Sequence, residues 1–525
     1  MGVGPRQDWI DGHSGGWMKR VLVLAAVAFA MAVSSPATAG ELEDAMALHQ
    51  TKANAASRHE RELAHYRLAI ALYRLKLVEV AYGLFSEIAD QPSHVRFDAT
   101  LVWLGRILSD LPDSADVDER VSRYDAAAIE RVKLESPELY WRLQYRLGRF
   151  HYKNRHYDAA LRVLASVDPK STHYPKAQFF AGMANVQMRR AVEAVHAFQR
   201  AVRAIDEGSE SLDPEGRVRD LALLSIARVY YSTAVRVDAE GDLAFDKQNL
   251  ATAINTYDAV DPAGEWWINA AFETSWAYFV RGDHARALGF VQTIGAFYPL
   301  TWDPGLDLLR TTVYFANCQY DDAATLAARF HTRYEPVAIE LAKTRALLDR
   351  ADRDESYYRF LKDVRDGRSN LMGGTRSAVE SALSDRELLR HLQYVTLIED
   401  EQKRFAKMPK TFVASPLGRD IADALELAHD LAVRHTSQLA RARYERAQTE
   451  LTEQLEDNVR ILTAAIAGQR GELDPRSIPF RVKPKDAEKN VVKNDDEHVI
   501  WPFTGELWPD EKGTFRQSIR SSCTR

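Results

Sequence analysis

Residues 145–160 read YRLGRFHYKNRHYDAA, and residues 179–194 read FFAGMANVQMRRAVEA. The two stretches align at an offset of 34 residues, so that Gly148 matches Gly182 and Ala160 matches Ala194. A small residue in each half of such a unit lets two antiparallel helices approach closely, while large apolar residues fill the space between them. The spacing therefore predicts a chain built from repeated helix pairs.

Further copies keep the same phase over roughly residues 60–335. Ser275 and Ala287 mark another clear copy, and weaker copies lie around residues 69–85 and 311–327. These units resemble the tetratricopeptide repeat. The resemblance implies an all-α solenoid over residues 40–345, whose concave groove holds a peptide or protein.

A second helical region, expected over residues 346–478, follows the repeats. One helix is expected to begin at Pro336, and Gly367 marks a break after it. Apolar residues between Leu417 and Ile466 mostly recur at steps of three, four or near seven, which predicts a long amphipathic helix. This helix could form a coiled coil and join two copies of the chain as a homodimer.

The last segment, residues 479–525, is expected to be a linker followed by a Trp-rich tail. Residues 499–501 and 514–519 could pair as short strands, forming a β-hairpin. The run 498–523 is similar to the ending of some repeat-containing envelope proteins of myxobacteria and their relatives, which implies no activity. Trp501, Phe503 and Trp508 either anchor this tail on the helical body or dock another envelope protein.

The first 39 residues predict export. Lys19 and Arg20 precede an apolar run at residues 21–33, and Ala37 and Ala39 provide the small side chains expected beside a signal-peptidase cut. The run is too short to span a bilayer, and no later apolar run reaches membrane-spanning length. We therefore expect a start at Met18, cleavage after Ala39, and a periplasmic or cell-envelope location.

Charge and cysteine content exclude some functions. The chain has 75 acidic and 69 basic residues, a formal charge of -6, so no excess of cations is present to bind nucleic acid. Cys318 and Cys523 are 205 residues apart, and we expect them to be unpaired, although an oxidising compartment would permit a disulfide. Two cysteines without histidines at ligand spacing do not predict a zinc site.

No catalytic, metal or cofactor site is predicted. His59 and His65 are six residues apart, which places them on different faces of a helix rather than on one metal-binding face. His429 and His435 have the same unsuitable spacing. The chain contains no nucleophile elbow and no phosphate-binding loop, and its acidic residues are mostly explained as ion-pair partners on solvated helix faces.

The repeat resemblance implies which residues line the concave groove. They are Tyr66, Tyr73, Arg74, Tyr145, Arg149, Tyr152, Lys153, Phe179, Arg228, Tyr231, Phe272, Trp276 and Phe279. Aromatic and basic groups suit a peptide that carries apolar and acidic residues, although each aromatic could instead belong to the packing between repeats. The arginines are expected to be exposed.

The function that these observations predict is a non-catalytic scaffold or assembly factor of the bacterial cell envelope, with a protein or peptide partner. The alternative is an envelope enzyme, such as a peptidoglycan-active one, in which the repeats are accessory. A converging set of carboxylates or histidines within residues 354–475 would favour that alternative.

Overall fold

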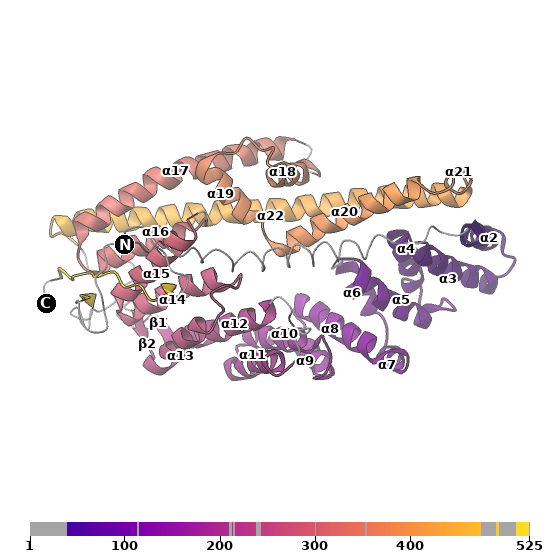
Figure 1. The fold of residues 1–525 in the computed structure, drawn as a ribbon, viewed down its shortest axis with the longest axis horizontal. Helices are drawn as coiled ribbons and strands as arrows, with labels where there is room; N and C mark the ends of the chain where they lie inside the picture. Colours follow the sequence, from indigo (N-terminus) through magenta and orange to yellow (C-terminus); the bar gives the residue numbers. More distant parts are fainter. Residues whose placement is uncertain are drawn as a thin grey trace, which may run out of the picture.

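The computed structural model shows an all-α solenoid, as the repeat spacing predicts (Figure 1). It describes residues 39–112, 115–208, 213, 216–237, 243–299, 301–351, 354–473, 490–492 and 511–523. Residues 1–38 of the expected signal segment lie outside this part of the chain, as do Trp501, Phe503, Trp508 and the strand expected at residues 499–501.

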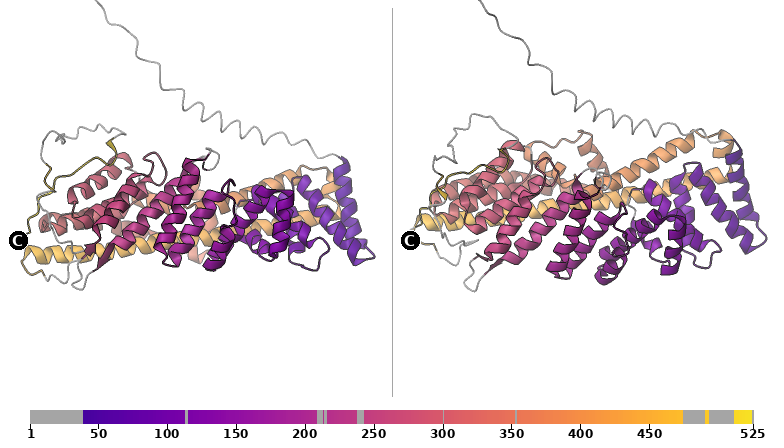
Figure 2. Two further views of the ribbon diagram at one scale, coloured as in Figure 1. Left: turned by 90° about the horizontal axis from the view of Figure 1, so that it is seen from below. Right: turned by 60° about the horizontal axis from the view of Figure 1, so that its bottom comes forward.

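Successive antiparallel helix pairs form an arc (Figures 1 and 2). The pairs are α3 (Arg58–Arg74) and α4 (Val78–Ala89), α5 (Phe97–Asp110) and α7 (Ala126–Glu135), α8 (Pro137–Lys153) and α9 (Tyr157–Leu164), α10 (Tyr174–Gln187) and α11 (Ala191–Asp206), α12 (Arg217–Ala234) and α13 (Lys247–Asp258), α14 (Trp267–Arg281) and α15 (His284–Phe297), and α16 (Pro304–Ala316) and α17 (Tyr320–Arg350). Helix α2 (Ala39–Asn54) packs against α3, and α6 (Ala115–Val121) is inserted between α5 and α7.

The small residues of the repeat lie where the helices of a pair meet. A Cβ atom on Gly148 would lie 2.5 Å from the Leu164 side chain, and one on Gly182 would lie 2.5 Å from the Phe198 ring. Ala160 and Ala194, at the matching positions of the second helices, have no exposed surface. The predicted register is therefore confirmed by the packing.

The turn between the two helices of a pair often requires a left-handed residue. The residues with positive φ in these turns are Lys76, Arg155, Arg189, Gly282 and Cys318. Only one of them is glycine, so the other four turns hold an L side chain in a conformation that costs free energy. The recurrence of this conformation shows that the tight turn is a property of the repeat.

The pair α12–α13 has a longer connection, as its sequence predicts. Strand β1 (Val235–Val237) pairs antiparallel with β2 (Leu243–Phe245), with Val235 opposite Phe245. This short hairpin lengthens the connection between α12 and α13.

A second layer of helices crosses the open side of the arc, along the top of Figure 1. It consists of α18 (Ser356–Arg365), α19 (Gly373–Ala382), α20 (Arg386–Ala406), α21 (Lys410–Val413) and α22 (Pro416–Gln469). The 54 residues of α22 match the long amphipathic helix that the sequence predicts. None of the described helices combines the length and apolar character that crossing a membrane requires.

Helix α17 differs from the prediction because it continues through Pro336 as one helix of 31 residues. Proline removes one backbone donor and usually ends or bends a helix, but packing against α22 supports this one on both sides of Pro336. Tyr444 donates to the Leu341 carbonyl at 3.0 Å, and Asn458 donates to the Ala327 carbonyl at 2.9 Å. The boundary expected after residue 345 therefore lies inside a helix.

Helix α22 joins the two ends of the arc, and we call it the chord. Its first half packs against α4 and α20, and its second half packs against α16 and α17. At its end, a Cβ atom on Gly468 would lie 2.8 Å from the Tyr320 ring. Residues from the first repeats and from the chord belong to one hydrophobic core, so the two predicted regions fold against each other.

The cysteines form a disulfide, Cys318–Cys523, so the expectation that they are unpaired is wrong. Cys318 occupies the left-handed turn between α16 and α17, and the tail returns to that turn. Because 205 residues separate the two cysteines, spacing alone could not reveal that the fold brings them together.

Candidate protein-binding groove

A groove of about 1020 Å³ lies between the first repeats and the chord. One wall consists of α2, α3 and α4, and the other consists of α20 and the first half of α22. The two walls are more than 300 residues apart in the sequence. The groove exists only because the chord returns to the beginning of the arc.

Apolar side chains line both walls of the groove. Leu68, Leu72 and Val80 contribute from the arc and are buried. Leu427 and Leu431 contribute from α22, where they are 62% and 55% exposed. These two leucines are one helical turn apart, so they form an apolar ridge on one face of α22. Exposed apolar surface within a groove is typical of a binding site.

The rim of the groove is polar and joins its walls. His49 Nε2 of α2 lies 2.8 Å from Asp420 Oδ2 of α22, which bridges the groove at one end. On the arc side, Glu87 lies 3.2 Å from His65 and 3.8 Å from Lys52. The hydrogen bond from His65, and then the charge of Lys52, lower the pKa of Glu87 although burial opposes them.

Two histidines meet at the other part of the groove. The rings of His391 in α20 and His435 in α22 are 4.5 Å apart. Burial, together with the neighbouring His435, lowers the pKa of His391 to about 4. His391 is therefore neutral at physiological pH, which keeps this part of the groove free of one positive charge.

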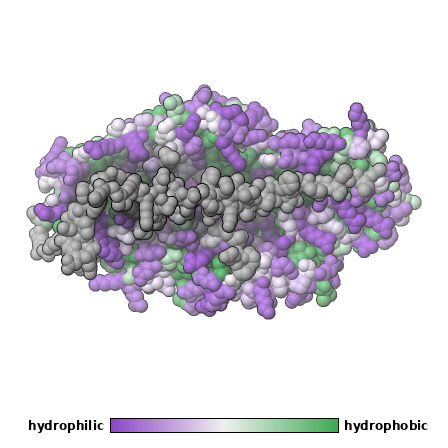
Figure 3. All heavy atoms as spheres, viewed as in Figure 1, coloured by the Kyte–Doolittle hydropathy of each residue, from purple (hydrophilic) through white to green (hydrophobic). Residues whose placement is uncertain are grey.

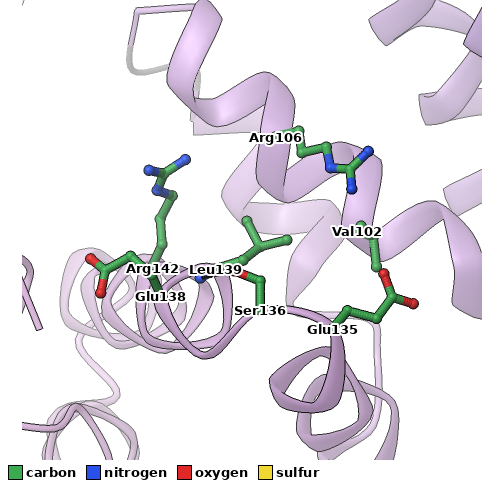
Figure 4. Close-up of a pocket in the computed structure, with 7 residues that line it drawn as sticks. All are labelled: Val102, Arg106, Glu135, Ser136, Glu138, Leu139 and Arg142. Carbon is green, nitrogen blue, oxygen red and sulfur yellow. Dashed lines mark hydrogen bonds between the residues drawn. The ribbon is translucent and has the colours of Figure 1, made fainter.

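Two other hollows on the described surface are smaller and more polar. Figure 4 shows one of about 310 Å³ beside the start of α8, with Glu138 and Arg142 on one side and Arg106 and Glu135 on the other. Another, of about 300 Å³, lies between α16, α19 and α22. On the face that Figure 3 shows, hydrophobic atoms form small separate patches among hydrophilic ones. The groove thus differs from these hollows in its size and apolar lining.

The chemistry of the groove suits binding. The described residues contain no group of three or more His, Cys, Asp or Glu side chains that could hold a metal ion. Within the groove, the carboxylates of Asp420 and Glu87 are engaged in ion pairs with neighbouring side chains. What remains available to a partner is the apolar ridge of Leu427 and Leu431.

The sequence-predicted site residues in the first copy pack against the next repeat. Trp103 donates to the Tyr66 hydroxyl at 2.9 Å, and the Tyr73 ring lies 5.4 Å from the Trp103 ring. Arg74 is exposed. The two tyrosines are therefore part of the contact between α3 and α5 in this structure.

The aromatic residues of α8 behave in the same way. The rings of Tyr145 and Tyr152 lie 6.0 and 5.5 Å from the ring of Phe180 in α10. Phe179 lies 5.5 Å from Phe198 in α11. The sequence left open whether these aromatic residues line the groove or pack between repeats, and in this structure they pack between helices.

Arg149 is 6% exposed, so the expectation that it is exposed is wrong. The inserted helix α6 supplies Asp118, whose carboxylate lies 3.4 Å from Arg149 Nη2 and accepts a bond of 2.6 Å from Arg146 Nε. Burial raises the pKa of Asp118 and lowers that of Arg146. Lys153 is exposed, and its Nζ lies 4.0 Å from Glu387 of α20.

The later predicted residues are divided between core and surface. Phe279 has no exposed surface, so its expected place in the groove is wrong, because its ring packs on His284 inside the α14–α15 pair. Arg228 is exposed and pairs with Glu273 at 2.6 Å. The half-buried aromatics are Tyr231, Phe272 and Trp276.

Sequence reasoning missed Leu427 and the facing wall of α2–α4. Leu431 belongs to the apolar series that predicts the long helix. The spacing of that series does not show which of its residues stay exposed in the folded protein. The available signal was Leu427, an apolar residue outside that series. Together with Leu431 it makes the apolar stripe of α22 wider than the series alone.

Comparisons with known proteins give no family assignment. No protein-family model matches the chain, and no curated protein matches it. Among solved structures, the chain is similar to the crystal structure of a Rap protein complexed with competence and sporulation factor. That match has 13% identity and a TM-score of 0.26, and it covers 75% of this chain and 99% of the other. With so low a TM-score, the match carries no argument, and the fold assignment rests on the helix pairs described above.

Proposed function

We propose that this protein is a non-catalytic scaffold or assembly factor of the bacterial cell envelope, which holds an α-helical segment of a partner protein in the groove. The observation that carries the proposal is the apolar ridge of Leu427 and Leu431, which is exposed within a groove of about 1020 Å³. Burying two leucines at an interface would contribute several kcal/mol, about 1.5–3 kcal/mol for each side chain.

The shape of the groove favours a helical partner. Both of its walls are helices, and Leu427 and Leu431 form a ridge with the spacing that fits between the side chains of another helix. An amphipathic helix could place its apolar face on this ridge and its polar face toward the solvent.

Export is part of the proposal, and two features support it. The signal-like segment at residues 18–39 is typical of secreted chains. The Cys318–Cys523 disulfide is typical of proteins that fold in an oxidising compartment.

Site-specific photo-crosslinking in the native host tests the proposal. A photoreactive amino acid at Leu431 should give a discrete crosslinked product in the envelope fraction, because this side chain would contact the partner. The same group at Leu134, which is 88% exposed on α7, is the control and should give none. N-terminal sequencing of the same preparation should begin at Gly40.

Four results would contradict the proposal or part of it. Equal products from both positions would show random contact, and no product from Leu431 would exclude the groove as the binding surface. A product made of two copies of this chain would identify a homodimer, the alternative occupant that the long helix suggests. A mature chain that still contains residues 1–39 would exclude cleavage at the proposed site.

A further inference from the structure

The C-terminal residues 511–523 lie along the repeats, with a turn over residues 511–514 followed by an irregular segment, and we call them the strap (Figure 1). Alternate side chains face the arc: Phe515, Gln517 and Ile519 are more buried than the residues between them. The Gln517 amide donates to the Ala285 carbonyl at 2.9 Å. A Cβ atom on Gly289 would lie 1.8 Å from the Phe515 carbonyl oxygen, so this glycine allows the strap to touch α15.

One end of the strap inserts a lysine into an aromatic cage. The Lys512 Nζ atom lies 5.4 Å from the ring centre of Trp267, 5.6 Å from that of Phe297 and 5.1 Å from that of Tyr298. It also donates to the Tyr298 hydroxyl at 2.9 Å and to the Pro262 carbonyl at 3.3 Å. Trp267 is 6% exposed, so the cage is built into the fold.

The cage has the chemistry of a site for a primary ammonium group. Three ring faces attract a cation through their quadrupoles, and the two oxygen atoms accept N–H bonds that a quaternary ammonium could not donate. A guanidinium group is planar and larger than the ammonium that fits between these groups. The chain fills this site with its own lysine.

The other end of the strap is covalently fixed. Cys523 is bonded to Cys318, and the Ser522 amide donates to the Asn317 carbonyl at 2.8 Å. Both cysteines are half-buried, so a small reductant has access to them. While the bond exists, the effective concentration of Lys512 at its cage is high, because both ends of the strap are held near the repeats.

We propose that the cage of Trp267, Phe297 and Tyr298 is a lysine-ammonium site, and that residues 511–523 are a strap that closes it and that a competing lysine can displace once Cys318–Cys523 is reduced. A dithiol supplies the two electrons and two protons: it becomes a disulfide, and Cys318 and Cys523 become thiols. With only Lys512 then holding this end of the strap, the cage can exchange it for the ε-ammonium of a lysine from another chain, for which Lys512 is the internal competitor.

Hydrogen exchange of the full chain, measured by mass spectrometry, tests whether the Lys512 cage and the Cys318–Cys523 disulfide each hold the strap. In the oxidised protein, Lys512→Met should speed exchange mainly at residues 511–514, because the disulfide still holds the other end. In the reduced protein the same variant should speed exchange over residues 511–523 by about tenfold or more relative to the reduced parent. Arg516→Met is the matched control, since Arg516 is exposed on the same strap.

The ligand class is tested with synthetic peptides of residues 511–519 that carry either lysine or methionine at position 512. The lysine peptide should displace the strap of the reduced parent and speed its exchange, and the methionine peptide should not. Exchange in α10 and α11 should stay constant throughout, which shows that the repeats remain folded. Equal behaviour of Lys512→Met and Arg516→Met, or an unchanged strap in the reduced Lys512→Met protein, would overturn the proposal.

Discussion

At the scale of single residues, the most informative group is Asp118 with Arg146 and Arg149. Two guanidinium groups and one carboxylate are almost fully buried between α6 and α8. Taking such charges out of water costs several kcal/mol per ion, and the direct contacts recover it only while the group is complete. The sequence predicted an exposed Arg149 because the repeat register assumes that nothing covers the concave face. In the structure, α6 covers this part of it.

Asp118→Ala should therefore destabilise the protein by about 3–5 kcal/mol, because it removes the carboxylate that two buried cations share. Asp98→Ala is the matched control: its bond to Arg131 is also 2.6 Å long, but Asp98 is 59% exposed. Breaking that surface pair should cost about 1 kcal/mol or less. Urea unfolding of both variants measures the difference, and equal losses would contradict the distinction between buried and surface pairs.

At the scale of elements, helix α20 supplies what helix α4 lacks locally. The N-cap residue Leu77 offers no side-chain acceptor. Instead, the Glu401 carboxylate of α20 accepts bonds from the amides of Val78, Glu79 and Val80 at 2.9–3.3 Å. Burial raises the pKa of Glu401 although these three amides oppose the shift. A carboxylate at a helix N-terminus also meets the positive end of the helix dipole.

Glu401→Ala should cost about 1–3 kcal/mol, because three buried amides lose their acceptor. Glu401→Gln should cost less, since its amide oxygen can still accept from part of this group. The control is Ser57→Ala, which removes the local cap of α3, where Ser57 accepts from the Glu60 amide at 3.1 Å. Hydrogen exchange should increase in both α4 and α20 for Glu401→Ala, but only in α3 for Ser57→Ala. An unchanged α20 in the first variant would show that the cap does not hold α20 against α4.

Local chemistry explains which elements the sequence could predict. Gly148, Gly182, Ala160 and Ala194 repeat at a fixed spacing because their contacts lie within one helix pair or between neighbouring pairs, so the pattern reports the fold directly. The contact of Glu401 with α4 and the facing walls of the groove join residues more than 300 positions apart, and no local pattern encodes such a meeting. The long helix was predictable as an element, and its position across the arc was not.

At the scale of the whole molecule, the chord changes the mechanics of the repeat array. In an open solenoid each repeat contacts only its neighbours, so the terminal repeats have one stabilising interface fewer than the others. Here α22 packs against α4 near one end of the arc and against α16 and α17 near the other. Both ends therefore gain an interface that an isolated array would not have.

This arrangement predicts that the ends of the arc will not unfold first. In hydrogen exchange measured at increasing urea concentrations, α3–α4 and α16–α17 should lose protection at the same concentration as the central pair α10–α11, or at a higher one, because removing either end also breaks its interface with the chord. Glu401→Ala provides the internal control: it should shift the midpoint of α3–α4 downward while leaving that of α10–α11 nearly unchanged. If α3–α4 in the parent loses protection well before α10–α11, the terminal repeats are fraying as in an open solenoid, and the chord does not act as the element that closes the arc.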